Sequence, residues 1–245
     1  SLTYVTSLMF EEFVQPSVQL FGIRVDEPIT TLTDLVVSAV CFFAFFKLRR
    51  IPVENKVQLY LKYYFLSMGF ATAIGGLVGH AFLYSLSFYW KLPGWLTSMF
   101  SIALVERAAI EYARPLVKPR VGRFFAWLNV IELVTFMTIT FITLNFFFVE
   151  VHTTYGLLIV VAGFSFYVYR KTRRRGSLMF LFAVGFSAIA ALFFMNKWGI
   201  SPWYNHFDIS HTFLTVAAIF FYKGARRVVN EPIGREEAEQ ESMPG

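Results

Sequence analysis

The chain has 245 residues and a net charge of +6, and 56% of its residues are apolar. Charged residues make up only 16%, whereas soluble domains carry about 25%. The mean hydropathy is +0.55. We expect no nucleic-acid partner, because the basic residues stand in short clusters between apolar runs, where they set membrane topology.

Seven apolar stretches approach the roughly 20 residues that a helix needs to cross a bilayer. They cover residues 29–46, 60–84, 95–112, 124–148, 153–169, 177–195 and 208–222. Charges at Glu106, Arg107 and Glu111 weaken the third stretch. The sequence therefore predicts an all-α membrane protein, a seven-transmembrane helix bundle.

Basic residues predict the orientation of this bundle. They gather at one side, within residues 47–62, 114–123, 170–175 and 223–235. The opposite side carries only Arg24, Lys91 and Lys197. By the positive-inside rule the N-terminus lies outside and the C-terminus is cytoplasmic, which an odd number of spans satisfies. We expect a multi-pass protein of a bacterial inner membrane.

Three regions follow from this topology. Residues 1–27 mix apolar and acidic side chains and predict an amphipathic helix on the outer membrane surface. Residues 28–224 form the bundle, and residues 225–245 have the composition of a solvated cytoplasmic tail. The single Cys41 excludes a disulfide framework and a thiolate cluster.

The four histidines fall near the outer face in this topology. His80 ends the second stretch, and His206 and His211 open the seventh. His152, at the start of the fifth, is interpreted as a loop residue. Ionisable side chains at membrane depth are costly and usually mark function. Imidazoles that converge on one level indicate a metal site.

Spacing sorts the candidate residues. Asp208 and His211 are three apart and share a helical face, whereas His206 reaches that face only if the helix begins after it. Imidazole and carboxylate suit Zn²⁺. We expect His80, His206 and His211 to bind Zn²⁺, and Asp208 or Asp34 to act as the catalytic acid or base.

Each of these residues also has an interpretation that needs no metal. Asn205 could cap the seventh helix, with Asp208 answering its dipole. His206 could lie in water, His80 could bond a carbonyl, and Asp34 could bond a neighbouring helix. Gly75, Gly76 and Gly79 favour close helix packing beside His80.

The pattern resembles the CREST-like superfamily of alkaline ceramidases and progestin and adiponectin receptors. These are seven-helix proteins in which a histidine late in the second helix and an HxxxH pair early in the seventh hold zinc. His80 matches the first position, and His211 matches one member of the pair. The segment NHFDISH, with Thr33, Asp34 and Leu35 in the first helix, also resembles an uncharacterised group of bacterial seven-helix proteins.

Several positions depart from the superfamily pattern. Phe207 and Thr215 stand four residues before and after His211, so the HxxxH spacing is broken. Gly76 replaces the serine expected four residues before His80. In place of an aspartate near the third helix stand only Thr97, Ser98 and Ser101.

The resemblance implies a zinc-dependent integral-membrane hydrolase that cleaves a lipid amide or ester at the outer headgroup level. Two alternatives stay open. One is a lipid receptor or sensor that binds a fatty acid beside a structural metal, and the other is a haem-binding electron carrier, since two histidines on facing helices can ligate haem iron.

A second polar group is predicted deeper in the bilayer. It comprises Glu106 and Arg107 on the third stretch and Asn129 and Glu132 on the fourth. An unpaired charge there would be expensive. An ion pair between Arg107 and Glu132 is the simple interpretation, and a proton or ion path is the alternative.

Overall fold

Long apolar stretches of the sequence fold into long helices in the computed structural model, which describes residues 13–52 and 55–234. The helices are α2 (Pro28–Arg49), α3 (Lys56–Ile74) with the π-helix η1 (Gly75–Ala81), α4 (Leu92–Ala113), α5 (Pro119–Thr143), α6 (Phe147–Thr154) with the π-helix η5 (Tyr155–Val161) and α7 (Ala162–Thr172), α8 (Arg175–Met195) and α9 (His206–Asn230). Short 3-10 turns η2 (Leu83–Ser85), η3 (Phe88–Lys91) and η4 (Arg114–Leu116) join some of them. The prediction of a helical protein is confirmed.

Local sequence signals place several helix starts. Proline stands in the first turn of α2, α4 and α5, where its missing N–H costs nothing. Asn55 caps α3 by accepting a hydrogen bond from the backbone N–H of Gln58 at 2.7 Å. Asn205 and Asp208 form a capping box at the start of α9.

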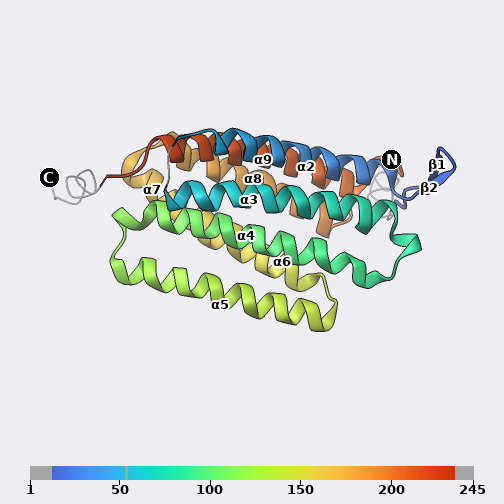
Figure 1. Cartoon of the computed structure of the whole chain (residues 1–245), viewed down its shortest axis with the longest axis horizontal. Coiled ribbons are helices and arrows are strands. Elements are labelled where there is room, and N and C mark those ends of the chain that lie inside the picture. The colour runs from blue at the N-terminus through green and yellow to red at the C-terminus, as the bar shows by residue number, and fades with distance from the viewer. Residues whose placement is uncertain (1–12, 53–54, 235–245) are drawn as a thin grey trace, which may run out of the picture.

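The helices run along one long axis, as Figure 1 shows. α4 is the most enclosed, with large and small side chains alike buried along its length. α2, α3 and α9 pack against one another, α8 lies on α9, and α5 lies at one edge beside α4 and α6. The buried core includes Leu48, Phe65, Ile110, Val161 and Phe180.

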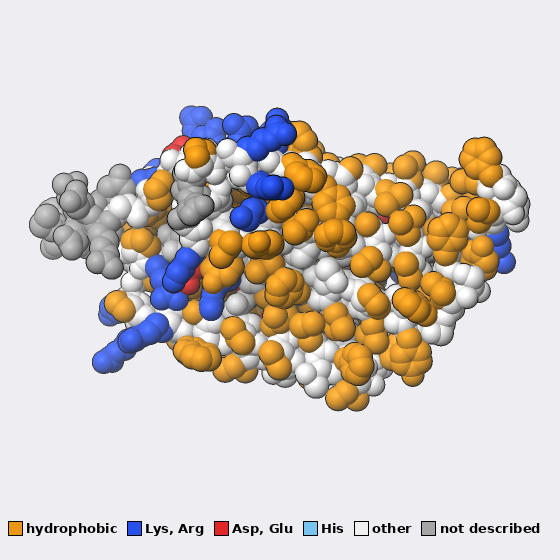
Figure 2. All heavy atoms as spheres, viewed as in Figure 1, with side chains coloured by type: hydrophobic (Ala, Val, Ile, Leu, Met, Phe, Trp, Pro, Cys, Tyr) orange, Lys and Arg blue, Asp and Glu red, His pale blue; other side chains and the backbone are white. Residues whose placement is uncertain are grey.

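Five helices are long and apolar enough to cross a membrane. They are Pro28–Arg49, Lys56–Ala81, Pro119–Thr143, Phe147–Thr172 and Arg175–Met195. Lys and Arg side chains gather at the end of the molecule near the last residues of α9 (Figure 2). Apolar side chains cover the middle of the same view. The chain is therefore plausible as a multi-pass membrane protein.

Both ends of the predicted bundle differ from expectation. Residues 13–27 form no helix, because Val18–Leu20 (β1) and Ile23–Val25 (β2) pair as antiparallel strands about a turn at Gly22. Residues 1–12, the first part of the predicted interfacial helix, lie outside the described residues. At the other end α9 continues to Asn230, so the predicted tail begins later than residue 225. Residues 235–245 are not described.

Candidate metal centre

Three ionisable side chains from three helical segments meet near the end of the bundle that carries the β1–β2 turn. Asp34 comes from α2, His80 from η1 and His211 from α9. The Nε2 atom of His80 lies 3.9 Å from Oδ2 of Asp34, and Nε2 of His211 lies 3.4 Å from Oδ1. The centroids of the two imidazoles are 6.3 Å apart. Each oxygen of one buried carboxylate thus faces one imidazole.

The other nitrogen of each imidazole is anchored. Nδ1 of His80 lies 2.5 Å from Oε2 of Glu27, and Nδ1 of His211 lies 3.0 Å from Oγ1 of Thr33. The Thr33 hydroxyl donates its own proton to the carbonyl of Thr30, so it accepts a hydrogen bond from Nδ1–H of His211. A neutral imidazole carries one N–H. Both rings therefore present the Nε2 lone pair towards Asp34 when they are neutral.

This arrangement of lone pairs calls for a cation. Two imidazole lone pairs that face one buried carboxylate repel it, and a buried charge without compensation is expensive. A proton on Nε2 or a metal ion between the groups removes the repulsion. Metal-ligating histidines commonly donate their second N–H to a carboxylate or another oxygen, as Glu27 and Thr33 provide here.

Local backbone features bring the three groups close. A Cβ atom on Gly76 would lie 3.0 Å from Cβ of Asp34 and 3.1 Å from the carbonyl oxygen of Thr31, so glycine lets α2 approach η1. Glu27 adopts a left-handed backbone, with φ 44°. Such strain in a residue with a side chain clusters at functional sites. The predicted packing role of the glycine face is confirmed at Gly76.

A cavity of about 680 Å³ opens beside the three groups. Asp34, His80 and His211 line it together with Thr72 and Ser98. Aromatic side chains form much of the remaining wall, namely Phe88, Trp90, Trp95, Phe146, Phe194 and Phe207. Lys91 also lines the cavity. A reactant here would meet both polar groups and aromatic rings.

Two charged groups of this region, those of Glu27 and Lys91, lie outside the long helices. Burial raises the pKa of the Glu27 carboxyl, but its hydrogen bond and charge interaction with His80 outweigh burial and hold the pKa below its ordinary value. Burial lowers the pKa of the Lys91 ammonium group. Glu27 thus stays ionised and can hold the Nδ1 proton of His80.

Asp208 has a structural place. Its Oδ1 accepts a hydrogen bond from the Thr30 hydroxyl at 2.8 Å. Its Oδ2 accepts from Gln15 at 3.2 Å and from the backbone N–H of Asn205 at 2.8 Å. Asp208 is fully buried and does not line the cavity. The capping interpretation is confirmed, and the position of Asp208 gives no support to the predicted catalytic role.

His206 is set apart from the other two predicted ligands. α9 begins at His206 itself, and the helix does not start after it, as a shared face with His211 requires. The centroid of its ring lies 4.3 Å from that of Phe207 and 6.1 Å from that of Phe194. The carboxylate of Asp34, and not the ring of His206, lies beside His80 and His211. The sequence predicted a role in proton transfer for Asp34.

A second ionisable group lies between α4, α5 and α6. Among the described residues, Glu106, Glu132 and His152 offer ligand atoms that all lie within 4.8 Å of one another. The predicted Arg107–Glu132 pair is wrong: Arg107 donates to the carbonyl of Ala126 and lies 3.9 Å from Glu111. His152 is fully buried and no loop residue. The sequence signal for this buried site was the position of His152 in the first turns of an apolar span.

Residues 29–230 match DUF6962, a family of unknown function. The chain belongs to the DUF6962 family. The matched segment begins just after Glu27 and contains Asp34, His80 and His211, together with the buried Glu106, Glu132 and His152. No curated protein and no solved structure matches the chain. DUF6962 membership thus leaves the chemistry to be argued from these two groups.

Proposed function

We propose that this protein is a zinc-dependent membrane hydrolase that cleaves a lipid amide or ester near the outer headgroup level. The metal would be held by His80, His211 and Asp34. One observation carries the proposal: the two Nε2 atoms converge on one carboxylate while both Nδ1 atoms are anchored. Asp34 takes the place that His206 had in the sequence-based hypothesis.

Two of the spacings between the three groups are close to those that the ion requires. Zinc–nitrogen bonds of about 2.0 Å in a tetrahedron separate neighbouring ligand atoms by about 3.3 Å. The two nitrogen–oxygen separations here are 3.4 and 3.9 Å. The two distances end on different oxygens of Asp34, so side-chain rotations would have to bring one carboxylate oxygen and both Nε2 atoms onto the ion. Three protein ligands would leave a fourth position for water or substrate, as in catalytic zinc sites, and all three side chains line the cavity.

The surrounding space supports an amphiphilic substrate. Besides the cavity, a second hollow of about 220 Å³ lies between α6, α8 and α9. It is lined largely by apolar residues such as Leu157 and Leu214, and it shares Phe146, Phe194 and His211 with the cavity. A polar headgroup in the cavity and an acyl chain in the apolar hollow would place the linking carbonyl beside His211.

The reaction adds water across the C–N or C–O bond. The hydroxyl group of water goes to the carbonyl carbon to give a fatty acid, and its proton goes to the leaving amine or alcohol. A bound Zn²⁺ supplies Lewis acidity and makes water acidic enough to react near neutral pH. Asp34 would hold the ion through its carboxylate and could accept a proton from the attacking water. Glu27 and Thr33 keep the imidazoles oriented.

The membrane orientation forms part of the same proposal. We infer seven spans with the N-terminus outside, because α4 and α9 run beside five helices of membrane-spanning length. α4 can carry Glu106 and Arg107 because neighbouring helices surround it. The candidate centre then lies at the outer level, where lipid can enter between helices.

Of the two other functions, the haem carrier fits less well and the receptor differs only in turnover. Haem iron would need two imidazole nitrogens on opposite sides of a porphyrin, but here the carboxylate of Asp34 stands between them. A lipid receptor with a structural metal would use the same ligands. Turnover separates a receptor from a hydrolase, because a receptor binds the lipid and releases no fatty acid.

Metal analysis of purified protein in detergent, after loading with Zn²⁺, tests the site. We expect His211→Ala and Asp34→Asn each to bind one zinc fewer than wild type. His206→Asn is the matched control and should keep the wild-type stoichiometry. If His206→Asn loses the zinc and Asp34→Asn keeps it, the ligands are His80, His206 and His211, and Asp34 is not a ligand.

Hydrolysis tests the activity. Incubation with a long-chain N-acyl lipid and with a fatty-acid ester should release free fatty acid. Asp34→Asn should reduce the rate by about 100-fold or more, since it removes both a ligand and the proton acceptor. Lipid binding by the zinc-loaded wild type without any release would favour the receptor.

A further inference from the structure

α5 is attached to the bundle by an unusual set of side chains. Its buried residues are Gly122, Ala126, Asn129, Glu132 and Thr140, none of them a large apolar side chain. Its large apolar residues point outward, with Trp127 70% and Ile131 58% exposed. Helices in membranes associate through small residues and polar contacts. The polar contacts of Glu132 and Asn129 are therefore central to holding α5.

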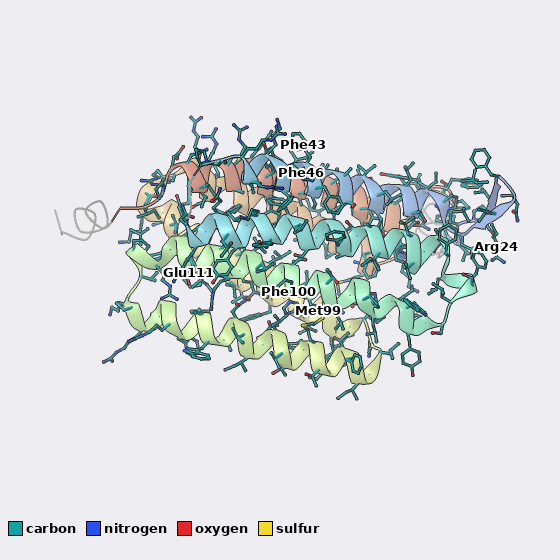
Figure 3. All side chains as sticks on the ribbon, in the orientation of Figure 1. Arg24, Phe43, Phe46, Met99, Phe100 and Glu111 are labelled. Atoms are coloured by element: carbon teal, nitrogen blue, oxygen red, sulfur yellow. The ribbon has the colours of Figure 1, made fainter. Side chains whose placement is uncertain are left out.

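Those contacts converge on a fully buried histidine. Nδ1 of His152, on α6, lies 2.7 and 2.8 Å from the two oxygens of Glu132. Nε2 lies 2.9 Å from the carbonyl oxygen of Met99 on α4; Met99 is labelled midway along that helix in Figure 3. A carbonyl only accepts hydrogen bonds, so Nε2 carries a proton. The neutral ring then turns its Nδ1 lone pair towards the Glu132 carboxylate.

Glu106 adds a second carboxylate. It lies on α4, is completely buried, and its Oε2 accepts a hydrogen bond from Asn129 at 3.2 Å. Its Oε1 is buried and has no hydrogen-bond partner among the described residues. A buried oxygen of this kind is costly unless something else binds it. A single proton shared by Glu132 and His152 would leave Glu106 Oε1 unsatisfied.

We propose that Glu106, Glu132 and Nδ1 of His152 form a second site for a divalent transition-metal ion, separate from the candidate hydrolytic centre. Two carboxylates and a neutral imidazole balance a charge of +2. Met99 orients the histidine through Nε2, in the way that outer oxygens orient ligating histidines. The ligands come from α4, α5 and α6, so the ion ties the edge helix α5 to the two helices beside it.

The neighbouring backbone supports this placement. η5, a π-helix, follows α6 directly, and π-turns inside helices are frequent at functional sites. A Cβ on Gly156 would lie 2.5 Å from Oε1 of Glu106. Glycine at this position therefore leaves room for the Glu106 carboxylate between α4 and η5.

Zinc stoichiometry is the test, with Zn²⁺ as the probe. Wild type should bind two ions per chain after loading and removal of excess metal. Glu106→Gln keeps the shape of the side chain and should bind one. The matched control Glu150→Gln removes a carboxylate from the same helix as His152 and should still bind two. The double variant Glu106→Gln with His211→Ala should bind none.

Thermal unfolding in detergent provides a second readout. A chelator should lower the melting temperature of wild type and of His211→Ala, lower that of Glu106→Gln by less than that of wild type, and leave that of the double variant unchanged. If wild type binds a single zinc, lost in His211→Ala and kept in Glu106→Gln, the second site is overturned and the proposed hydrolase stands. If the single zinc is lost in Glu106→Gln instead, the hydrolytic centre is overturned. Equal zinc in wild type and Glu106→Gln means that the group holds only a proton.

Discussion

A single hydrogen bond decides which nitrogen of His80 faces the cavity. Glu27 holds Nδ1 at 2.5 Å, so Nε2 points to Asp34. Glu27 stands just before α2 in a left-handed conformation, and the backbone N–H of Asp26 bonds the carbonyl of Ala81 at 3.1 Å. The turn before α2 is therefore fastened to the end of η1. The ligand geometry depends on a residue outside the helices.

The lowered pKa of Glu27 predicts a pH dependence of stability. In the unfolded chain the carboxyl has its ordinary pKa of 4.5, and in the folded protein its pKa is lower. The stabilisation from Glu27 is fully present above pH 4.5 and is lost as the pH falls through the lower value. Because 31% of the side chain is exposed, we expect less than about 1 kcal/mol.

Thermal unfolding of chelator-treated protein between about pH 6 and pH 3 would measure this effect. The melting temperature of wild type should fall by a few degrees more than that of Glu27→Gln over this range, since about 1 kcal/mol shifts it by about 2–4 °C in a chain of this size. Glu231→Gln, directly after α9 and at the end away from His211, is the control. Its melting temperature should change with pH as that of wild type does. Parallel curves for wild type and Glu27→Gln would show that the pair contributes nothing.

At the scale of the elements, the π-helix η5 packs so closely against α4 that Gly156 has no room for a side chain. A Cβ on Gly156 would meet Oε1 of Glu106 at 2.5 Å and Cγ2 of Ile102 at 2.6 Å. Gly156→Ala should destabilise the protein by about 1–3 kcal/mol. Gly163→Ala, on the continuing helix α7, meets nothing within 4 Å and should be neutral or stabilising. Comparison of their melting temperatures checks this, and equal values would contradict the close approach of Glu106.

The helices could be predicted from the sequence because length and hydropathy decide them. Each expected span overlaps a helix, and counting residues along the spans placed His80 and His211 near one end of the bundle, where the structure brings their rings within 6.3 Å. Side-chain faces were harder to predict. His206 and His211 are five positions apart, which puts them on different faces of a regular helix. The face of His80 could not be predicted from a regular 3.6-residue turn, because η1 is a π-helix. Nothing in the local pattern marks a π-turn.

The partners of the polar residues were the least predictable feature. Glu132 was paired with Arg107 by charge alone, whereas His152 reaches it from the next helix along the chain. Thr33 entered the sequence analysis only as part of a sequence pattern, yet it anchors His211 from the neighbouring helix α2. Such contacts depend on how helices rotate against one another. Hydropathy constrains this rotation weakly when lipid surrounds apolar side chains on most faces.

At the scale of the whole molecule, charge is distributed unevenly between the two ends. Figure 2 shows Lys and Arg concentrated at the end near the last described residues of α9, while the candidate metal centre lies at the other. This asymmetry is the basis for the N-out orientation. The hydrolase proposal depends on it, because the orientation decides which leaflet supplies the lipid.

Cysteine labelling can measure the orientation. Cys41 is the only cysteine and is buried, so Cys41→Ala gives a suitable background. In that background Tyr89→Cys, at a position 65% exposed between η1 and α4, should react with a membrane-impermeant maleimide in intact cells. Lys171→Cys, near the end of α7, should react only after the membrane is opened. Both positions are exposed in the folded protein, so lack of labelling reflects the membrane and not burial. If Lys171→Cys reacts in intact cells and Tyr89→Cys reacts only after opening, the metal centre lies on the cytoplasmic side. The inner leaflet would then supply the substrate.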